Sequence, residues 1–212
     1  MIVPYEARFR KDLVEICWRT GLYGKDLTGT DYFMDKEAFA LCFCLHYAEF
    51  SPDLCFIALN EERKAIGYIL GTTDTKAQKA DYVRQMLPRL RRHLFFNTFW
   101  MSREDYLKMS AWAKNRKRPR LEDELLGAYP AHLHINLLPG YQGQGHGSQL
   151  MDTLLTEFRR RGVPGVHLGT NSANEKAVPF YKKQGFALLD EKPGDMWGLG
   201  GDLKSLVFGL KL

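Results

Sequence analysis

A glycine-rich stretch in the second half of the chain has the residue types and the spacing of an anion-binding loop. Glycine stands at positions 143, 145 and 147, after a stretch (133–138) apolar enough for a buried strand and before a helix predicted over 148–161. Glycine reaches positive φ and lets the backbone approach a ligand closely. A helix N-terminus adds unpaired N–H groups and the positive end of a dipole. The order of strand, glycine loop and helix therefore predicts a site for phosphate groups.

Three phosphate-binding patterns compete for this loop, and two of them do not fit. A dinucleotide fingerprint requires G-x-G-x-x-G and an acidic residue after the next strand, whereas the strand predicted over 165–168 is followed by glycine and threonine. A mononucleotide loop requires Gly-Lys-Ser/Thr, and no lysine stands here. The third pattern, Gln/Arg-x-x-Gly-x-Gly/Ala, is met by Gln142, Gly145 and Gly147. It resembles the pyrophosphate loop of the GNAT superfamily of acyl-CoA N-acyltransferases.

A second motif follows in the order that this resemblance requires. Asn174, Ala177, Tyr181, Gly185 and Phe186 match the N-x-x-A-x-x-x-Y-x-x-x-G-F segment that comes after the fifth strand in GNAT enzymes. One predicted helix and one predicted strand separate the two motifs. The resemblance covers about residues 130–190, and its order is compatible with the whole chain.

The helix of this second motif carries its own start and stop signals. Ser172 and Glu175 form a possible capping box, and Gly185 is a natural stop. Pro179 lacks the N–H that would bond the Glu175 carbonyl, so we expect a shortened or loosened first turn. The position of Asn174, just before this turn, depends on the same expectation.

Two further stretches narrow the resemblance. Pro130-Ala-His-Leu-His-Ile-Asn-Leu-Leu-Pro139 and Gly162-Val-Pro-Gly-Val-His-Leu-Gly169 are similar to the acetyltransferase-like domain at the C-terminus of O-GlcNAc hydrolases and to its stand-alone microbial relatives. Members of that branch differ in whether the acetyl-CoA loop is intact, and their acceptor is not established. Because the loop residues are present here, the resemblance implies that the chain binds acetyl-CoA.

The resemblance also implies where acetyl-CoA binds. In GNAT folds the fourth strand splays from the fifth, and the pantetheine arm enters between them and bonds to main chain. The implied cofactor-binding residues are Leu137 and Leu138 by main chain, Gln142, Gly143, Gln144, Gly145, His146, Gly147 and Ser148 at the pyrophosphate, Asn174 and Phe180 along the pantetheine, and Tyr181. Tyr181 is the implied acid for the leaving thiolate, since a phenol with a pKa near 10 is protonated at neutral pH. The alternative is a tyrosine that only packs its helix.

The general base is left open by the sequence. His132, His134 and Asn136 share one face of the predicted strand by their period of two. A histidine near the splay could accept a proton through water, but a structural histidine hydrogen-bonded to a loop explains the pattern equally well. Asp74, at the end of the third strand, is the other candidate. The candidate catalytic residues are therefore Tyr181, His134, His132 and Asp74.

The chain of 212 residues, 45% of them hydrophobic, predicts one domain, 1–212, with a sizeable core. The implied fold is α/β (α+β): a GNAT fold whose mixed central sheet of about six to seven strands is flanked by helices, with strands four and five splayed. We expect a strand over 1–7, helices over 8–19 and 34–49, strands over 54–59 and 66–71, and a closing hairpin from 187–191 and 204–212. The segment 192–202 between the hairpin strands is either a substrate lid or a long loop.

A basic helical insertion between strands three and four, about 76–120, departs from a minimal GNAT domain. It holds 13 Lys and Arg against 3 Asp and Glu. Two helices are expected, over 77–92 and 102–115, joined by an aromatic connector over 95–100. The run Arg116-Lys-Arg-Pro-Arg120 is interpreted as a solvated loop, an anion or nucleic-acid contact, or a nuclear address in a eukaryotic source.

Four cysteines, at 17, 42, 44 and 55, bear on the compartment of the protein. Cys42 and Cys44 alternate with apolar residues and are too close for a usual zinc site, so buried free thiols are the favoured interpretation and no metal is expected. A reducing, cytoplasmic location follows, with the nucleus as an option in a eukaryote. No secretory signal or membrane span is predicted.

The predicted function is an acetyl-CoA-dependent N-acetyltransferase that transfers acetyl to a primary amine by direct attack in a ternary complex. The expected acceptor is a small-molecule amine or a peptide or protein lysine, the expected assembly is a monomer or homodimer, and neither membrane nor nucleic acid is an expected partner. Two alternatives remain. The first is a domain that binds acetyl-CoA without turnover, and the second is a chromatin- or nucleic-acid-associated module that uses the basic insertion.

Overall fold

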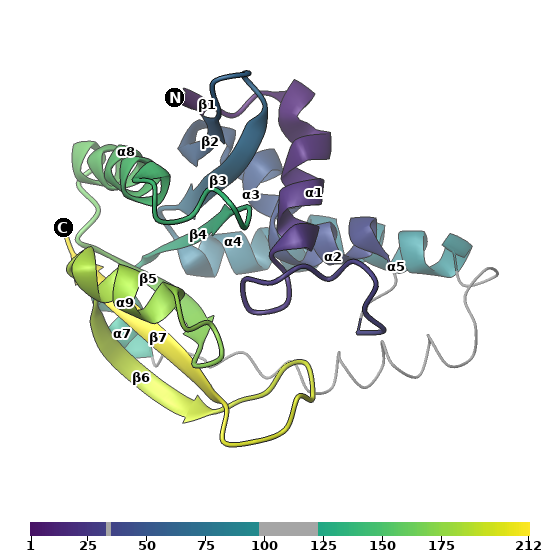
Figure 1. The fold of residues 1–212 in the computed structure, drawn as a ribbon. Helices are drawn as coiled ribbons and strands as arrows, with labels where there is room; N and C mark the ends of the chain where they lie inside the picture. Colours follow the sequence, from purple (N-terminus) through teal and green to yellow (C-terminus); the bar gives the residue numbers. More distant parts are fainter. Residues whose placement is uncertain (33–34, 98–122) are drawn as a thin grey trace.

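The computed structural model describes residues 1–32, 35–97 and 123–212, and a seven-stranded mixed sheet forms its centre (Figure 1). The strand order is β1-β2-β3-β4-β5-β7-β6, and β4 and β5 run parallel while the other neighbours are antiparallel. The strands are β1 (Ile2–Pro4), β2 (Cys55–Leu59), β3 (Ala65–Thr72), β4 (Ala131–Leu137), β5 (Gly165–Asn171), β6 (Ala187–Pro193) and β7 (Lys204–Lys211). The predicted mixed sheet of six to seven strands is confirmed.

Helices cover both faces of this sheet. On one face α1, α2 and α3 enclose a core that includes Tyr68 and Leu70 of β3. On the other face α8 and α9 enclose a second core with Leu133 of β4 and Val166 of β5. The helices are η1 (Ala7–Phe9), α1 (Arg10–Arg19), α2 (Lys36–Phe43), α3 (Leu45–Phe50), η2 (Pro52–Leu54), α4 (Thr75–Asp81), the π-helical turn η3 (Tyr82–Met86), α5 (Leu87–Asn97), α7 (Asp123–Ala128), α8 (His146–Arg160) and α9 (Ala177–Lys183).

Strands β4 and β5 pair over only two residues and then separate. Ala131 is in register with Val166 and His132 with His167, and no later residues of the two strands pair. Beyond this point β4 stays paired with β3, and β5 stays paired with β7 along its whole length. The gap opens toward the C-terminal ends of both strands, as the resemblance implied.

The hydrogen-bond pattern of β4 shows which of its backbone groups face this gap. In an antiparallel pair, alternate residues exchange both of their hydrogen bonds with the partner strand. The Leu138 N–H donates to the Ile66 carbonyl at 2.9 Å, so Asn136 and His134, two and four residues earlier, are also bonded toward β3. The N–H and C=O groups of the intervening residues therefore point away from β3 and into the gap. These residues are Ile135 and Leu137; Leu133 has the same orientation, but its N–H bonds to β5 in the pairing of His132 with His167.

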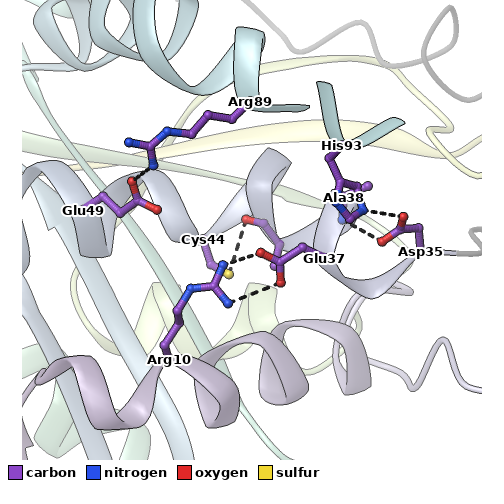
Figure 2. Close-up of polar contacts among 9 residues, drawn as sticks. Arg10, Asp35, Glu37, Ala38, Cys44, Glu49, Arg89 and His93 are labelled. Atoms are coloured by element: carbon purple, nitrogen blue, oxygen red, sulfur yellow. Dashed lines mark hydrogen bonds and ion pairs between the residues drawn. The ribbon is translucent and has the colours of Figure 1, made fainter. Parts of the chain in front are cut away.

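Helix α5 is fastened to the body of the protein by charged side chains (Figure 2). His93 Nε2 lies 2.6 Å from Asp35 Oδ2, while the other oxygen of Asp35 caps the N-terminus of α2. Arg89 forms an ion pair with Glu49 of α3. These two side chains of the insertion thus hold α5 against α2 and α3. Each contacts a carboxylate of the protein instead of forming part of an open cationic surface.

Three parts of the predicted helices differ from the structure or lie outside it. The helix expected over 34–49 is divided at Cys44, whose backbone angles (φ −127°, ψ −39°) leave the helical region, so α2 and α3 are separate. Phe95 and Phe96, expected in a connector, are exposed residues of α5. The second helix of the insertion (102–115), the end of the connector and the basic run 116–120 lie outside the described residues.

The start of α9 corrects one prediction and confirms another. The predicted capping box does not form, because the Ser172 hydroxyl accepts a hydrogen bond from the Lys204 N–H and the helix begins only at Ala177. Pro179 is the third residue of α9, where an N–H has no intrahelical partner to lose. The shortened first turn is therefore confirmed.

The four cysteines are free and buried, as predicted. Among the residues that the structure describes, no helix is both long and apolar enough to cross a membrane.

Two glycines of the sheet form a matched pair for testing this packing. A Cβ on Gly71 would lie 2.8 Å from Phe158 and 2.9 Å from Leu154 of α8, whereas a Cβ on Gly169 would meet nothing within 4 Å. We expect Gly71→Ala to lower the free energy of unfolding by roughly 1–3 kcal/mol through overpacking. We expect Gly169→Ala to raise it by up to about 1 kcal/mol, because alanine restricts the unfolded chain. Denaturant unfolding followed by circular dichroism measures both, and equal destabilisation would contradict the packing.

Candidate functional site

The gap between β4 and β5 is part of a deep cleft that reaches both faces of the sheet. From one side it is lined by the loop after β4 and by α9, and from the other by residues of α1, α2 and α3. Most residues predicted from the two motifs meet here. Those that line the cleft are Leu137, Gln142, Gly143, Gly145, Gly147, Ser148, Asn174, Phe180 and Tyr181.

The glycine loop at the end of β4 leaves its backbone amides unused. Gly143 and Gly145 have φ values of 78° and 87°, and Gly145 is the N-cap of α8. No hydrogen bond among the described residues takes the N–H groups of 143–148 as donors. With the positive end of the α8 dipole, these N–H groups form a concave site for an anion. The predicted phosphate loop therefore has the geometry that phosphate binding needs.

Gln142 fixes this loop to the elements on either side of the gap. Its Nε2 donates to the Leu137 carbonyl at 3.1 Å, and its Oε1 accepts from Lys176 Nζ at 3.1 Å. Ser148, at the start of α8, accepts a hydrogen bond from Gln184 at the end of α9. The loop is thus held in place, and a lysine ammonium stands beside it.

Three of the predicted binding residues do not line the cleft. Both main-chain polar groups of Leu138 are used within the chain, because its N–H donates to Ile66 and its carbonyl accepts from Tyr141. The Gln144 side chain is exposed and donates to the Gly140 carbonyl, and His146 is also absent from the lining. Of the two predicted main-chain contacts, only Leu137 presents a backbone N–H to the gap.

Asn174 and Phe180 lie on the α9 side of the gap. Phe180 packs against the loop, since a Cβ on Gly147 would lie 3.3 Å from its ring. The Asn174 amide lies against Gly24 in the loop after α1, where a Cβ would be 3.1 Å from its Oδ1. Asn174 thus stands where the glycine loop, α9 and the α1–α2 loop approach one another.

Tyr181 is a buried titratable group that α9 presents to the cleft. Its ring is buried beside those of Phe180, Phe186 and Phe208. Burial raises the pKa of Tyr181 far above its ordinary value, because the phenolate would be poorly solvated there. Tyr181 is therefore protonated at neutral pH, as a proton donor must be.

Comparison with known proteins adds the deciding observation. A family model described as "Acetyltransferase (GNAT) family" matches residues 108–186. The solved structure of SsHAT is 31% identical, with 100% of this chain and 97% of that chain covered and a TM-score of 0.71. The chain belongs to the GNAT acetyltransferase family.

Other members of the family are less similar or match over less of their length. An uncharacterized N-acetyltransferase of Mycobacterium tuberculosis is 42% identical over 54 residues, which cover 26% of this chain and 35% of that protein. The match thus spans about a third of such a curated relative. A phosphinothricin acetyltransferase from Sinorhizobium meliloti, solved with acetyl-CoA, is 14% identical at a TM-score of 0.60, with 100% of this chain and 88% of that chain covered. It shows the fold alone.

In this GNAT acetyltransferase, the predicted base candidates lie in different surroundings. His132, His134 and Asn136 share one face of β4, as predicted, because they contact Tyr47, Tyr68 and Thr20 on the α1–α3 side. Asp74 is exposed and does not line the cleft. Its carboxylate caps α4 by accepting from Lys76 and Ala77, which favours a structural role over the catalytic one.

Two residues of the site were missed from the sequence. His167 of β5 lines the cleft with its ring centroid 4.9 Å from that of His132. Tyr47 of α3 places its Oη 2.5 Å from His132 Nδ1. For His167 a signal existed, because a polar residue alternates there with the buried Val166 and Leu168. For Tyr47 there was none, because the contact joins residues 85 positions apart.

The segment between β6 and β7 covers one end of the cleft and is bound to the α1–α2 loop. The Tyr23 hydroxyl accepts from the Met196 N–H at 2.9 Å and donates to Asp195 Oδ1 at 3.4 Å. Trp197 is buried and stacks on Phe39 of α2. Tyr23 itself has a φ of 50°, a strained value for this residue type that its contacts maintain. The segment predicted as a lid or a long loop is therefore docked in the structure.

This docking gives a prediction for Tyr23. Burial is the main cause that raises the pKa of Tyr23 to about 12, so the neutral hydroxyl is present at physiological pH. Tyr23→Phe removes the acceptor of the Met196 N–H, and a net loss of about 1 kcal/mol speeds its hydrogen exchange roughly fivefold. Tyr5→Phe is the control, because Tyr5 directly follows β1, the strand at the edge of the sheet. Unchanged exchange at Met196 would contradict the docking.

Proposed function

We propose that the protein is an acetyl-CoA-dependent N-acetyltransferase whose acceptor, a primary amine, attacks the thioester directly in a ternary complex. The observation that carries this proposal is the row of unused backbone N–H groups at 143–148, set at the end of a gap in which the edge of β4 also lacks a partner. The loop residues 143–145 are exposed, so their N–H groups are accessible to a ligand from solvent. An extended ligand arm that ends in a pyrophosphate supplies partners to both.

The chain's own groups fit the parts of acetyl-CoA in order. The amides of the glycine loop, with Lys176 beside them, suit the pyrophosphate. The N–H and C=O groups of Ile135 and the N–H of Leu137 suit an amide-bearing pantetheine arm that takes the place of a strand. Phe180 and Asn174 supply an apolar and a polar wall. When bound, acetyl-CoA supplies an activated acetyl group as a thioester.

The chemistry of transfer requires two proton movements. The acceptor ammonium must lose a proton before its nitrogen can attack, and the sulfur must gain one as it leaves. We assign the second step to Tyr181, which is protonated and lines the cleft. The imidazoles of His132, His134 and His167 line the cleft and can accept the first proton.

We also propose that the protein is related to the acetyltransferase-like domains of O-GlcNAc hydrolases. The full-length similarity to SsHAT and the stretches 130–139 and 162–169 support this relationship. The acceptor is proposed to be a small primary amine or a lysine side chain. A domain that binds acetyl-CoA without turnover is the competing proposal, and the two experiments below separate them.

The first experiment measures thermal stabilisation by acetyl-CoA. A ligand at 100 times its Kd that binds only the folded state adds about 2.7 kcal/mol, which corresponds to roughly 5–11 °C for a chain of this size. Gly145→Glu should abolish the shift, because it places a carboxylate at the anion site. Gly162→Glu is the matched control, since it makes the same change at a positive-φ glycine with open space beyond the C-terminal end of α8. No shift in the wild type would refute the proposed function.

The second experiment tests turnover through Tyr181. Tyr181→Phe should lower kcat by roughly 100-fold or more, because general acid catalysis contributes about that much, while the shift with acetyl-CoA stays. Thiol release from acetyl-CoA with a panel of primary amines measures the rate, and Tyr5→Phe is the control. Acetyl-CoA binding with no release for any amine, in the wild type as in the variant, would favour the protein that binds without turnover.

A further inference from the structure

The closed end of the gap, where β4 and β5 last pair, carries two histidines. His132 and His167 are the last residues in register, and side chains of paired residues in neighbouring strands point to the same face. Their ring centroids are 4.9 Å apart at an interplanar angle of 66°. Both lie on the α1–α3 face, opposite the α8 face on which Val166 and Leu168 are buried. The histidine pair therefore stands where the gap meets the α1–α3 side of the sheet, which we take as the side from which the acceptor enters.

The hydrogen bonds of His167 fix which of its nitrogens can accept a proton. Its Nδ1 lies 2.8 Å from the Tyr129 carbonyl oxygen. A carbonyl only accepts, so Nδ1 carries the hydrogen and Nε2 of the neutral ring holds the lone pair. Burial is the main cause that lowers the pKa of His167, so the neutral ring is the form present at pH 7. A base in this state is ready to receive a proton.

His132 is engaged differently. Its Nδ1 is 2.5 Å from the hydroxyl of Tyr47, which is 3% exposed, and the two rings lie nearly parallel at 19°. This hydroxyl can either donate to Nδ1 or accept from it, so the tautomer of His132 is not fixed as that of His167 is. Tyr47 thus holds the His132 ring in the position from which it packs against His167.

The space next to His167 is open. Gly169 is two residues further along β5 on the same face, and a Cβ there would meet nothing within 4 Å. Both His167 and Gly169 line the cleft. An amine that enters from the acceptor side can therefore reach the floor of the cleft beside the His167 ring.

We propose that His167 is the general base of the reaction and that Tyr47, acting through His132, is a positioning residue; this inference rests on the proposed function. The amine nitrogen loses two protons. The first passes to His167 Nε2 and on to solvent, and the Tyr129 carbonyl stabilises the imidazolium through the Nδ1–H. As the C–N bond forms and the C–S bond breaks, Tyr181 gives its proton to the sulfur, and the second proton from nitrogen restores the phenol.

The test compares two small acceptors that differ in protonation. n-Butylamine is an ammonium ion at neutral pH and needs a base, whereas hydroxylamine is already unprotonated there. His167→Asn keeps a side-chain N–H at the position of Nδ1 for the Tyr129 carbonyl but removes the base. We expect kcat/KM for n-butylamine at pH 7 to fall about 100-fold or more and the value for hydroxylamine to fall less than about fivefold. A merely structural role would lower both equally, and that result would overturn the proposal.

The matched control is His93→Asn, and Tyr47→Phe is the second test variant. His93→Asn makes the same change at a histidine of α5 that contacts Asp35, and it should leave the ratio of the two rates unchanged. Tyr47→Phe should lower the n-butylamine rate about tenfold and alter its pH profile, with little change for hydroxylamine. Other titratable groups that line the cleft, which the profile must take into account, include His46, His134, Tyr82, Lys76 and Lys79.

Two further results separate this proposal from the proposed function. If the wild type transfers acetyl to neither amine, nor to any amine of the panel, although acetyl-CoA stabilises it, the transferase function itself is refuted. Nitrogen-15 NMR of the imidazoles gives a readout that needs no acceptor, and we expect His167 in the Nδ1–H form with a pKa below the ordinary value. An Nε2–H form of His167 would overturn its assignment as base and leave the acetyl-CoA site unaffected.

Discussion

The separation of β4 from β5 after two residue pairs is the constraint on which the rest of the site depends. It leaves one edge of β4 with backbone N–H and C=O groups that face a cleft where a neighbouring strand would otherwise pair with them. Such groups need partners. Each half of the sheet keeps its own neighbours beyond this point, because β4 is paired with β3 and β5 is paired with β7.

The other parts of the site lie around this gap in a definite order. The glycine loop stands at its open end, with its amides free and its position fixed by Gln142. Tyr181 faces the cleft from α9, and the histidine pair stands at the closed end. The α1–α3 side of the cleft is bounded by α2, by the α1–α2 loop and by the docked segment after β6, which Tyr23 and Trp197 hold in place. The glycine loop and the histidine pair thus lie at opposite ends of one opening.

The sequence predicted the parts of this arrangement that depend on local rules. Gly143 and Gly145 were recognisable because the loop needs positive φ, and the common face of His132, His134 and Asn136 because a strand alternates its side chains. What failed depends on contacts between distant residues. Ser172 bonds to Lys204 and forms no capping box, and the Leu138 N–H is used by Ile66 of β3. The role of Tyr47 and the division of the helix at Cys44 likewise depend on packing.

The same two-residue junction divides the sheet mechanically. In the described sheet, a four-stranded half (β1–β4) and a three-stranded half (β5–β7) pair as strands only where 131–132 meet 166–167. The cohesion of the two halves must therefore come mainly from side chains, above all from the core under α8 and α9, where Leu133 and Val166 meet Phe158 and Tyr181. A ligand arm that paired with β4 inside the gap would lie along the seam between the halves. Its hydrogen bonds and contacts would then join the two halves, so that a bound ligand would make the whole sheet more rigid.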